Sequence, residues 1–140
     1  MKTQVERAKQ GEITPQMDRV SNGESIDLDI LLSQIAECSA VIMSRENKSI
    51  GIGKKLKTKV NVNIGTSTLK IEPDEEIKKA RIAEKYGADT LTDLSMGGNI
   101  TQIRRKIFEN TTLPITTIPI YQTAAEIGLD GMEWNYIFSS

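Results

Sequence analysis

The sequence predicts an α/β protein: the first three β/α units of a (β/α)8 barrel, preceded by a small, mostly helical segment. Segments typical of strands and of helices alternate from residue 60 to residue 122. The expected helical crossovers suit neighbouring strands that run parallel. Asn63, Thr92 and Tyr121 lie at matching places on the three expected strands, each 29 residues after the one before. Repeated β/α units would produce such a period.

The length of the chain sets a limit on this barrel. A complete eight-unit barrel takes about 250 residues, whereas this chain has 140. We therefore expect an incomplete barrel, whose sheet has an open edge. We divide the chain into an N-terminal segment, residues 1–53, and a partial barrel, residues 54–140.

Composition excludes several classes of protein. The formal net charge is −1, so no overall field attracts nucleic acid or an anionic membrane. No apolar run approaches 18 residues, and the N-terminus lacks the apolar stretch of a signal peptide. Cytoplasmic location is therefore the expectation, with no membrane partner.

Two residue counts restrict the chemistry. Cys38 is the single cysteine and the chain has no histidine. An internal disulfide and a cysteine-based metal site are therefore excluded. The absence of histidine removes catalytic triads and zinc hydrolases, unless another chain supplies the residue. We accordingly predict no metal ligands and identify no catalytic residue.

The N-terminal segment carries the weaker structural signals. Residues 3–10 predict a short helix, and the apolar spacing of residues 26–35 predicts a second helix. Residues 41–43 favour a short strand. The polar run at residues 44–49 is typical of a loop.

The first β/α unit has a clear pattern. Residues 60–65 alternate between apolar and asparagine side chains, which predicts a strand. Pro73 then suits the first position of a helix, because proline lacks the backbone donor that the first turn leaves unpaired. Lys85 lies in the expected last turn and Gly87 follows as the cap.

The second and third units follow the same order. Residues 90–94 predict a strand, and Asn99 is placed to cap a helix with an apolar stripe that includes Ile103 and Ile107. Residues 115–121 predict the third strand. Pro119 cannot donate to a sheet, so we expect this strand to be strained or bulged near its end.

The asparagines of the first strand are the first candidate ligand contacts. Alternation places Asn61 and Asn63 on one side of the strand and its aliphatic residues on the other. Amides that point into a barrel are costly unless something satisfies them. A polar ligand is one such partner, and neighbouring strand or loop groups are the other.

Three further features have two interpretations each. The turn of residues 65–67 could present amides to an anion such as phosphate, or be a plain tight turn. Asp93, beside Thr92 and Ser95, could orient a ligand or pair with a basic side chain. Tyr121 could stack on a flat ligand or belong to the core.

Basic residues form two groups that could bind nucleic acid. No aromatic residues interleave with them and the chain is slightly acidic, so solvated surfaces are the favoured interpretation and a nucleic-acid module is disfavoured. The residues are Lys54, Lys55, Lys57 and Lys59 in one group and Arg104, Arg105 and Lys106 in the other.

Taken together, these segments resemble the phosphomethylpyrimidine synthase family of thiamine biosynthesis. The resemblance is carried by residues 59–67, 86–90, 93–95 and 119–122, in order and with their spacing kept. The opening, around Ile13-Thr14-Pro15 and Met17, is also similar to the start of that family. The resemblance covers nearly the whole chain.

The resemblance implies a radical lyase that converts 5-aminoimidazole ribotide to 4-amino-5-hydroxymethyl-2-methylpyrimidine phosphate. It implies S-adenosylmethionine and a [4Fe–4S] cluster as cofactors, with zinc or another divalent metal in full-length members. Asn63, Thr92 and Tyr121 match positions that contact the ribotide in the family. The family's cluster and metal ligands lie beyond the matched segments, so we expect this chain to bind neither group alone.

Several residues depart from the family pattern. Thr92 stands where the family usually has methionine, and Thr116 stands where it usually has glycine. These departures leave a paralogue similar to 5-hydroxybenzimidazole synthase as one alternative. Another is a non-enzymatic remnant that binds a phosphorylated imidazole. Homo-oligomerisation, or pairing with a partner chain through the open barrel edge, is the expected mode of association.

Overall fold

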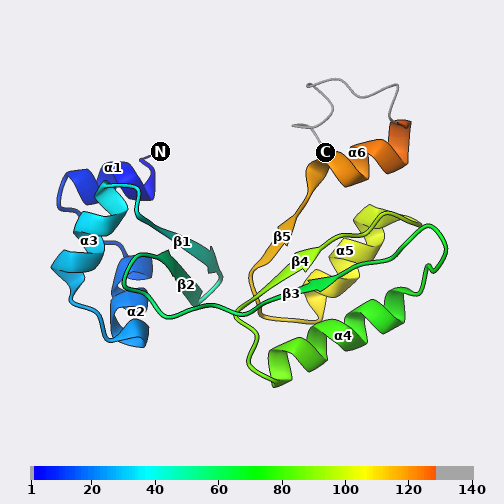
Figure 1. The fold of residues 1–140 in the computed structure, drawn as a ribbon, viewed down its shortest axis with the longest axis horizontal. Helices are drawn as coiled ribbons and strands as arrows, with labels where there is room; N and C mark the ends of the chain where they lie inside the picture. The colour runs from blue at the N-terminus through cyan, green and yellow to red at the C-terminus, as the bar shows by residue number, and fades with distance from the viewer. Residues whose placement is uncertain (1, 129–140) are drawn as a thin grey trace. The chain divides into compact units, whose positions relative to one another are not determined.

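The structure, a computed structural model, describes residues 2–128. It is a mixed α/β protein with two sheets (Figure 1). The chain divides into two compact units between Lys59 and Val60, whereas the sequence analysis put the division between residues 53 and 54. Each unit has its own hydrophobic core. Among residues 2–128, no helix has the length and apolar character that crossing a bilayer requires.

The first unit, residues 2–59, combines three helices with a β-hairpin. The helices pack around a core that includes Met17, Val20, Leu31 and Ile35. The two predicted helices and the short predicted strand are confirmed. The elements are α1 (Gln4–Lys9), α2 (Pro15–Glu24), α3 (Leu28–Ala36), β1 (Ala40–Arg45) and β2 (Lys48–Gly53).

The loop predicted at residues 44–49 is wrong. β1 and β2 pair antiparallel, and Arg45 faces Lys48 in their register. The connection is therefore a two-residue turn at Glu46 and Asn47, with a positive φ of 50° at Glu46. Tight hairpins need such left-handed residues at the turn. The polar run forms the end of one strand, the turn and the start of the next.

Helix α2 is an element that the sequence analysis did not predict. Thr14 is its N-cap and accepts a hydrogen bond from the N–H of Met17 at 3.2 Å, and Pro15 occupies the first helical position. Threonine before proline is a common helix start, because the hydroxyl satisfies a free N–H and proline has none to satisfy.

A half-buried ion pair joins α2 to the end of the first unit. Glu24 Oε1 lies 2.8 Å from Lys59 Nζ, and Glu24 Oε2 accepts the N–H of Lys57 at 2.8 Å. Burial raises the pKa of the Glu24 carboxyl. The hydrogen bonds from Lys59 and Lys57 more than offset this, so the pKa lies below its ordinary value of 4.5.

Because the folded pKa of Glu24 is lowered, its charged form stabilises the fold above about pH 4.5 and that stability is lost as the pH falls further. We expect Glu24→Gln to lower the free energy of unfolding by about 1 kcal/mol at pH 7. The difference from wild type should shrink by pH 3. Denaturant unfolding at both pH values measures it. Lys59→Met should show the same trend, and an unchanged difference at pH 3 would contradict the assignment.

The second unit, residues 60–128, alternates strands and helices. Its three strands pair parallel in the order β3-β4-β5, which confirms the predicted β/α alternation. Its elements are β3 (Asn61–Ile64), α4 (Pro73–Lys85), β4 (Thr90–Asp93), α5 (Ile100–Glu109), β5 (Ile115–Thr117) and α6 (Pro119–Ile127).

The predicted third strand, residues 115–121, is confirmed for residues 115–117 and wrong for the rest. β5 ends at Thr117, and Pro119 is the first residue of α6 rather than a strained strand position. Tyr121 therefore lies on a helix and not at the end of a strand. In the register of the sheet, Asn63 lies beside Thr92 and Thr92 beside Thr116, which is 24 residues later. The 29-residue period therefore does not extend to the third strand.

Helices α4 and α5 supply the core of the second unit (Figure 1). Ile64 and Leu91 from the sheet pack with Ala80 and Ala83 of α4 and Ile107 of α5. The predicted alternation in β3 is confirmed, because Val62 and Ile64 pack against this core while the asparagines lie on the other face.

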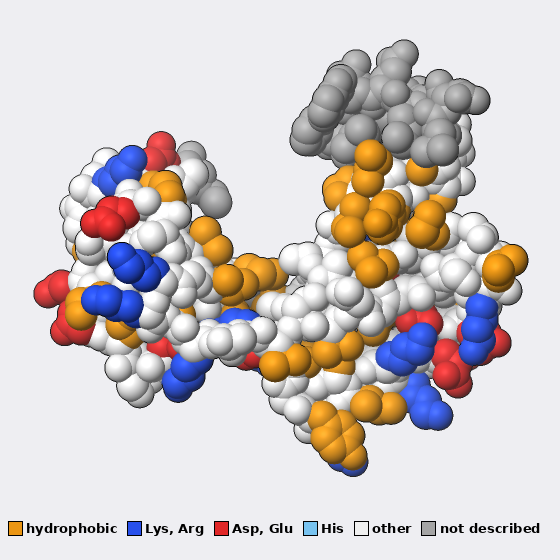
Figure 2. All heavy atoms as spheres, viewed as in Figure 1, with side chains coloured by type: hydrophobic (Ala, Val, Ile, Leu, Met, Phe, Trp, Pro, Cys, Tyr) orange, Lys and Arg blue, Asp and Glu red, His pale blue; other side chains and the backbone are white. Residues whose placement is uncertain are grey.

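Apolar side chains are also exposed on the second unit (Figure 2). Val60, Ile82 and Tyr86 are exposed and line an open groove of about 410 Å³ between β3 and α4. Within residues 2–128, β3 pairs on one side only, so this groove runs beside an open sheet edge.

Candidate functional site

Five polar side chains line the face of the second sheet that the core does not use. We call them the polar ladder: Asn61, Asn63, Thr90, Thr92 and Thr116. Their arrangement follows from strand geometry, since alternate residues share a face and the parallel register sets neighbours side by side. Asn61 faces Thr90, Asn63 faces Thr92, and Thr92 faces Thr116.

Hydrogen bonds join the ladder across all three strands. Asn61 Oδ1 accepts from the hydroxyls of Thr90 at 2.9 Å and Thr92 at 3.0 Å. Asn61 Nδ2 donates to Asn63 Oδ1 at 3.0 Å. The hydroxyls of Thr92 and Thr116 are 2.8 Å apart. Neighbouring side chains thus satisfy Asn61, as one of the two sequence interpretations anticipated.

Asn63 differs from Asn61 in what remains unsatisfied. Its side chain is exposed, and within residues 2–128 its Nδ2 has no hydrogen-bond partner. A free amide donor beside two hydroxyls can bind an acceptor atom of a polar ligand. The β3–β4 register places Asn63 beside Thr92, at matching positions of the two strands as the sequence predicted.

Tyr121 is placed apart from this register. It is the third residue of α6, its N–H donates to Ile118 O at 3.0 Å, and its side chain is 37% exposed. The side chain is thus not a buried core residue. It lies close in sequence to the carboxyl end of β5, the end of a parallel strand where ligand-binding residues gather in α/β proteins.

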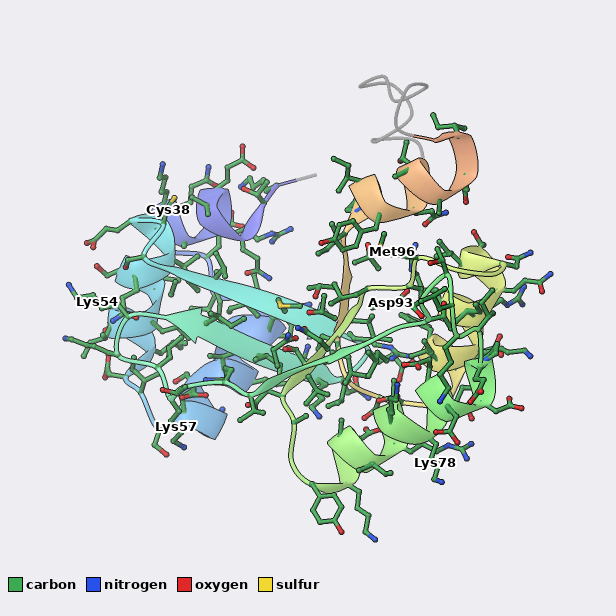
Figure 3. The ribbon with its side chains drawn as sticks, turned by 45° about the vertical axis from the view of Figure 1, so that its right-hand side comes forward. Cys38, Lys54, Lys57, Lys78, Asp93 and Met96 are labelled. Atoms are coloured by element: carbon green, nitrogen blue, oxygen red, sulfur yellow. The ribbon has the colours of Figure 1, made fainter. Side chains whose placement is uncertain are left out.

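Asp93 is the centre of a second polar cluster, between β4 and α5 (Figure 3). Its Oδ2 accepts from Arg104 Nε at 3.0 Å, and its Oδ1 accepts from the N–H and hydroxyl of Ser95 at 3.0 and 2.5 Å. Arg104 Nη1 also donates to Gln122 Oε1 at 2.6 Å, which attaches α6 to α5. Asp93 thus pairs with a basic side chain, one of its two predicted roles.

The turn after β3 is a structural turn. Gly65 N–H donates to Glu76 Oε2 at 2.7 Å, and Thr66 N–H donates to Ser95 Oγ at 3.2 Å. Ser67 N–H donates to Lys70 O at 3.1 Å. All three amides are therefore occupied, and the anion-binding interpretation of this turn is wrong.

The loops after β3 and β4 touch at glycines. A Cβ added at Gly97 would lie 2.4 Å from Ser67 O, and one added at Gly65 would lie 2.5 Å from Ser95 N. Thr66 Oγ1 donates to Gly97 O at 2.7 Å. Glycine is required at both positions because the two backbones are in contact.

Several of the basic residues considered for nucleic-acid binding make ion pairs. Lys59 pairs with Glu24, Arg104 with Asp93, and Arg105 with Glu109 at 3.0 Å. Lys54 and Lys57 lie on the first unit (Figure 3). Arg104 belongs to the second unit. The paired side chains have carboxylate partners within their own unit.

The chain's own residues do not fit an iron–sulfur cluster or a zinc site. A [4Fe–4S] cluster needs several cysteine thiolates, and Cys38, exposed on the first unit (Figure 3), is the chain's single cysteine. The chain has no histidine. Within residues 2–128, no group of three or more potential ligands is close enough to hold a metal ion.

The sequence did not predict all members of the polar ladder or of the Asp93 cluster. Thr90 and Thr116 belong to the ladder, and Arg104 and Gln122 complete the Asp93 cluster. Alternation along the second and third strands could have found the two threonines. The Arg104 contact has no sequence signal, because it depends on how α5 packs on β4.

Comparison with known proteins shows what this chain is similar to. The family model described as Radical SAM ThiC family matches residues 3–139. A phosphomethylpyrimidine synthase of Methanococcus maripaludis is 46% identical over 134 residues, 94% of this chain and 30% of the relative. One of Methanocaldococcus jannaschii is 48% identical over 123 residues, 86% of this chain and 29% of the relative.

A third relative has a different name. A 5-hydroxybenzimidazole synthase of Desulfuromonas acetoxidans is 46% identical over 125 residues, 87% of this chain and 29% of the relative. The chain thus spans about 30% of the length of the curated relatives that it matches. The predicted resemblance is confirmed: the chain belongs to the Radical SAM ThiC family.

Proposed function

We propose that the chain is the N-terminal part of a radical S-adenosylmethionine lyase of thiamine biosynthesis. The reaction would convert 5-aminoimidazole ribotide to 4-amino-5-hydroxymethyl-2-methylpyrimidine phosphate, in the cytoplasm. The observation that carries the proposal is the 46% identity, over 94% of the chain, to a phosphomethylpyrimidine synthase. The chain's role would be to form part of the substrate pocket.

The polar ladder is the proposed ribotide-binding surface. Asn63 has a free amide donor and faces Thr92 across the β3–β4 pair. A ribotide offers ring nitrogens, hydroxyls and phosphate oxygens, all of which accept hydrogen bonds. Tyr121, on the helix that follows β5, would be the third contact and would place its half-exposed ring against the ligand.

The second unit would be three units of a (β/α)8 barrel. Parallel strands with crossover helices on one face support this, because a barrel has its helices outside and its site inside. The open edge of β3 and the apolar groove beside it would be covered by further strands and helices of the same barrel. Those elements, or a second chain, would also cover the ladder.

The cofactors would be bound by other residues than these. In a complete enzyme, S-adenosylmethionine and a [4Fe–4S] cluster would supply the radical that starts the rearrangement. With one cysteine and no histidine, this chain does not hold the cluster or a zinc ion. Its own residues would bind and orient the ribotide.

Titration of the chain with 5-aminoimidazole ribotide tests the proposal. We expect Asn63→Ala to weaken binding about tenfold, since a lost hydrogen bond to a charged or polar ligand costs about 1.5 kcal/mol. Isothermal titration calorimetry measures it. Gln102→Ala, which removes an exposed amide from α5, is the matched control and should bind as wild type does. A folded wild-type chain that binds no ribotide would contradict the proposal.

A paralogous activity is the second candidate. The 5-hydroxybenzimidazole synthase matches the chain at 46% identity, as high as a phosphomethylpyrimidine synthase. Mass spectrometry of the product that the complete protein forms from the ribotide separates the two activities. A hydroxymethylpyrimidine phosphate supports the first, and a hydroxybenzimidazole supports the second.

A further inference from the structure

We propose that Asn61 is a positioning residue. Held by two threonine hydroxyls, it fixes the amide of Asn63 so that Asn63 Nδ2 points its hydrogens to the open face of the sheet and binds a hydrogen-bond acceptor. The identity of the acceptor as part of the ribotide rests on the proposed function. The orientation of the Asn63 amide does not depend on it.

The orientation of Asn61 follows from Thr90. The Thr90 side chain is buried, with the residue 4% exposed, and within the described residues Asn61 is the one partner of its hydroxyl. Buried donors without an acceptor are rarer in proteins than buried acceptors with an unused lone pair. The Thr90 hydroxyl therefore donates, and the Asn61 atom 2.9 Å away is the oxygen.

The second hydroxyl supports the same orientation. Thr92 Oγ1 lies 3.0 Å from that oxygen, and an amide oxygen can accept two hydrogen bonds. Thr116 Oγ1 lies 2.8 Å from Thr92 Oγ1 and 3.2 Å from Leu91 O. Two hydroxyl protons serve these three contacts. When Thr92 donates its proton to Asn61, Thr116 therefore donates to Thr92, the shorter contact, rather than to Leu91 O.

The orientation of Asn63 follows from that of Asn61. With its oxygen turned to the threonines, Asn61 turns Nδ2 to Asn63, and the atom 3.0 Å away must be an acceptor, Asn63 Oδ1. Two NH₂ groups at this distance would repel each other. Asn63 therefore directs Nδ2 away from Asn61, toward an acceptor such as a phosphate oxygen or a ring nitrogen.

Hydrogen exchange of side-chain amides, measured by NMR on the ¹⁵N-labelled chain, tests the orientation without any ligand. We expect the Asn61 NH₂ to exchange several-fold more slowly than the Asn63 NH₂. In Asn61→Asp, a carboxylate of the same shape that can only accept, the Asn63 amide should turn, donate to this carboxylate and exchange more slowly than it does in the wild-type chain. Asn63 protected in the wild-type chain, or unchanged in Asn61→Asp, would overturn the inference.

Titration with 5-aminoimidazole ribotide tests the consequence for binding. Asn61→Ala should weaken binding about two- to tenfold, because Asn63 loses its orientation but keeps its amide. Thr117→Val, which changes the opposite face of β5, is the control and should leave the affinity unchanged. Wild-type affinity in Asn61→Ala would overturn the positioning role. If the wild-type chain binds no ribotide, the proposed function fails, and the exchange pattern alone decides the inference.

Discussion

Replacing Asp93 with alanine should lower the free energy of unfolding by about 3 kcal/mol, near the low end for a broken buried ion pair. Asp93 is 1% exposed and accepts three hydrogen bonds, two from Ser95 and one from Arg104. Its loss leaves the Ser95 N–H without an acceptor. The side chain of Arg104 is 25% exposed and can partly hydrate, which limits the cost. Denaturant unfolding followed by circular dichroism measures the change.

Asp74→Ala is the matched control for Asp93. Asp74 is an exposed aspartate in the first turn of α4. Its carboxylate interacts with the positive end of the helix dipole, so its removal should cost less than about 1 kcal/mol. Equal losses for the two variants would show that the Asp93 cluster contributes no more to stability than a surface carboxylate does.

Leu91→Ala should also destabilise the second unit strongly, by about 2–5 kcal/mol. Leu91 is fully buried in the middle of β4, the central strand, and packs in the core with residues of α4 and α5. Truncation removes its contacts and leaves a cavity between the sheet and both helices. The same unfolding experiment measures the loss.

Leu69→Ala provides the comparison at a surface position. Leu69 is 98% exposed in the loop between β3 and α4, so its truncation should change the free energy of unfolding by no more than about 0.5 kcal/mol. If Leu91→Ala were as mild as Leu69→Ala, the second unit would not be held by the core described above.

Two prolines show how far local sequence signals predict this fold. Pro73, followed by three acidic residues, predicts a helix start, and α4 begins there. Pro119 gives the same signal without acidic residues, and α6 begins there. The 29-residue period, extended to Tyr121, predicts a strand at this position instead. The local preference of proline for the first helical turn was the better guide.

The hairpin of the first unit shows a different limit. Residues 44–49 are polar, and polarity alone does not separate a loop from two exposed strand ends. The turn is made by Glu46 at positive φ rather than by glycine, so the usual sequence signal for a tight hairpin is missing. Pairing of β1 with β2 decides the structure here, and pairing is not a property of either segment alone.

The sequence predicts only the part of the candidate site that depends on a single strand. Alternation in a single strand is enough to put Asn61 and Asn63 on one face, and β3 confirms it. The identity of their neighbours depends on register, which brings Thr92 to Asn63 and Thr116 to Thr92. The Asp93–Arg104 contact depends on the packing of a helix on a strand, which lies beyond pattern analysis.

The backbone contact between the loops after β3 and β4 has a consequence for motion. Gly65 and Gly97 leave no side-chain volume between these loops, and Thr66 bonds to Ser95 and Gly97 across the contact. The backbone contact prevents one loop from moving closer to the other, and sliding past it or moving apart would break these bonds. The loops after β3 and β4 should therefore open and close together as one cooperative segment. A displacement of the loop after β3 would then displace the loop after β4.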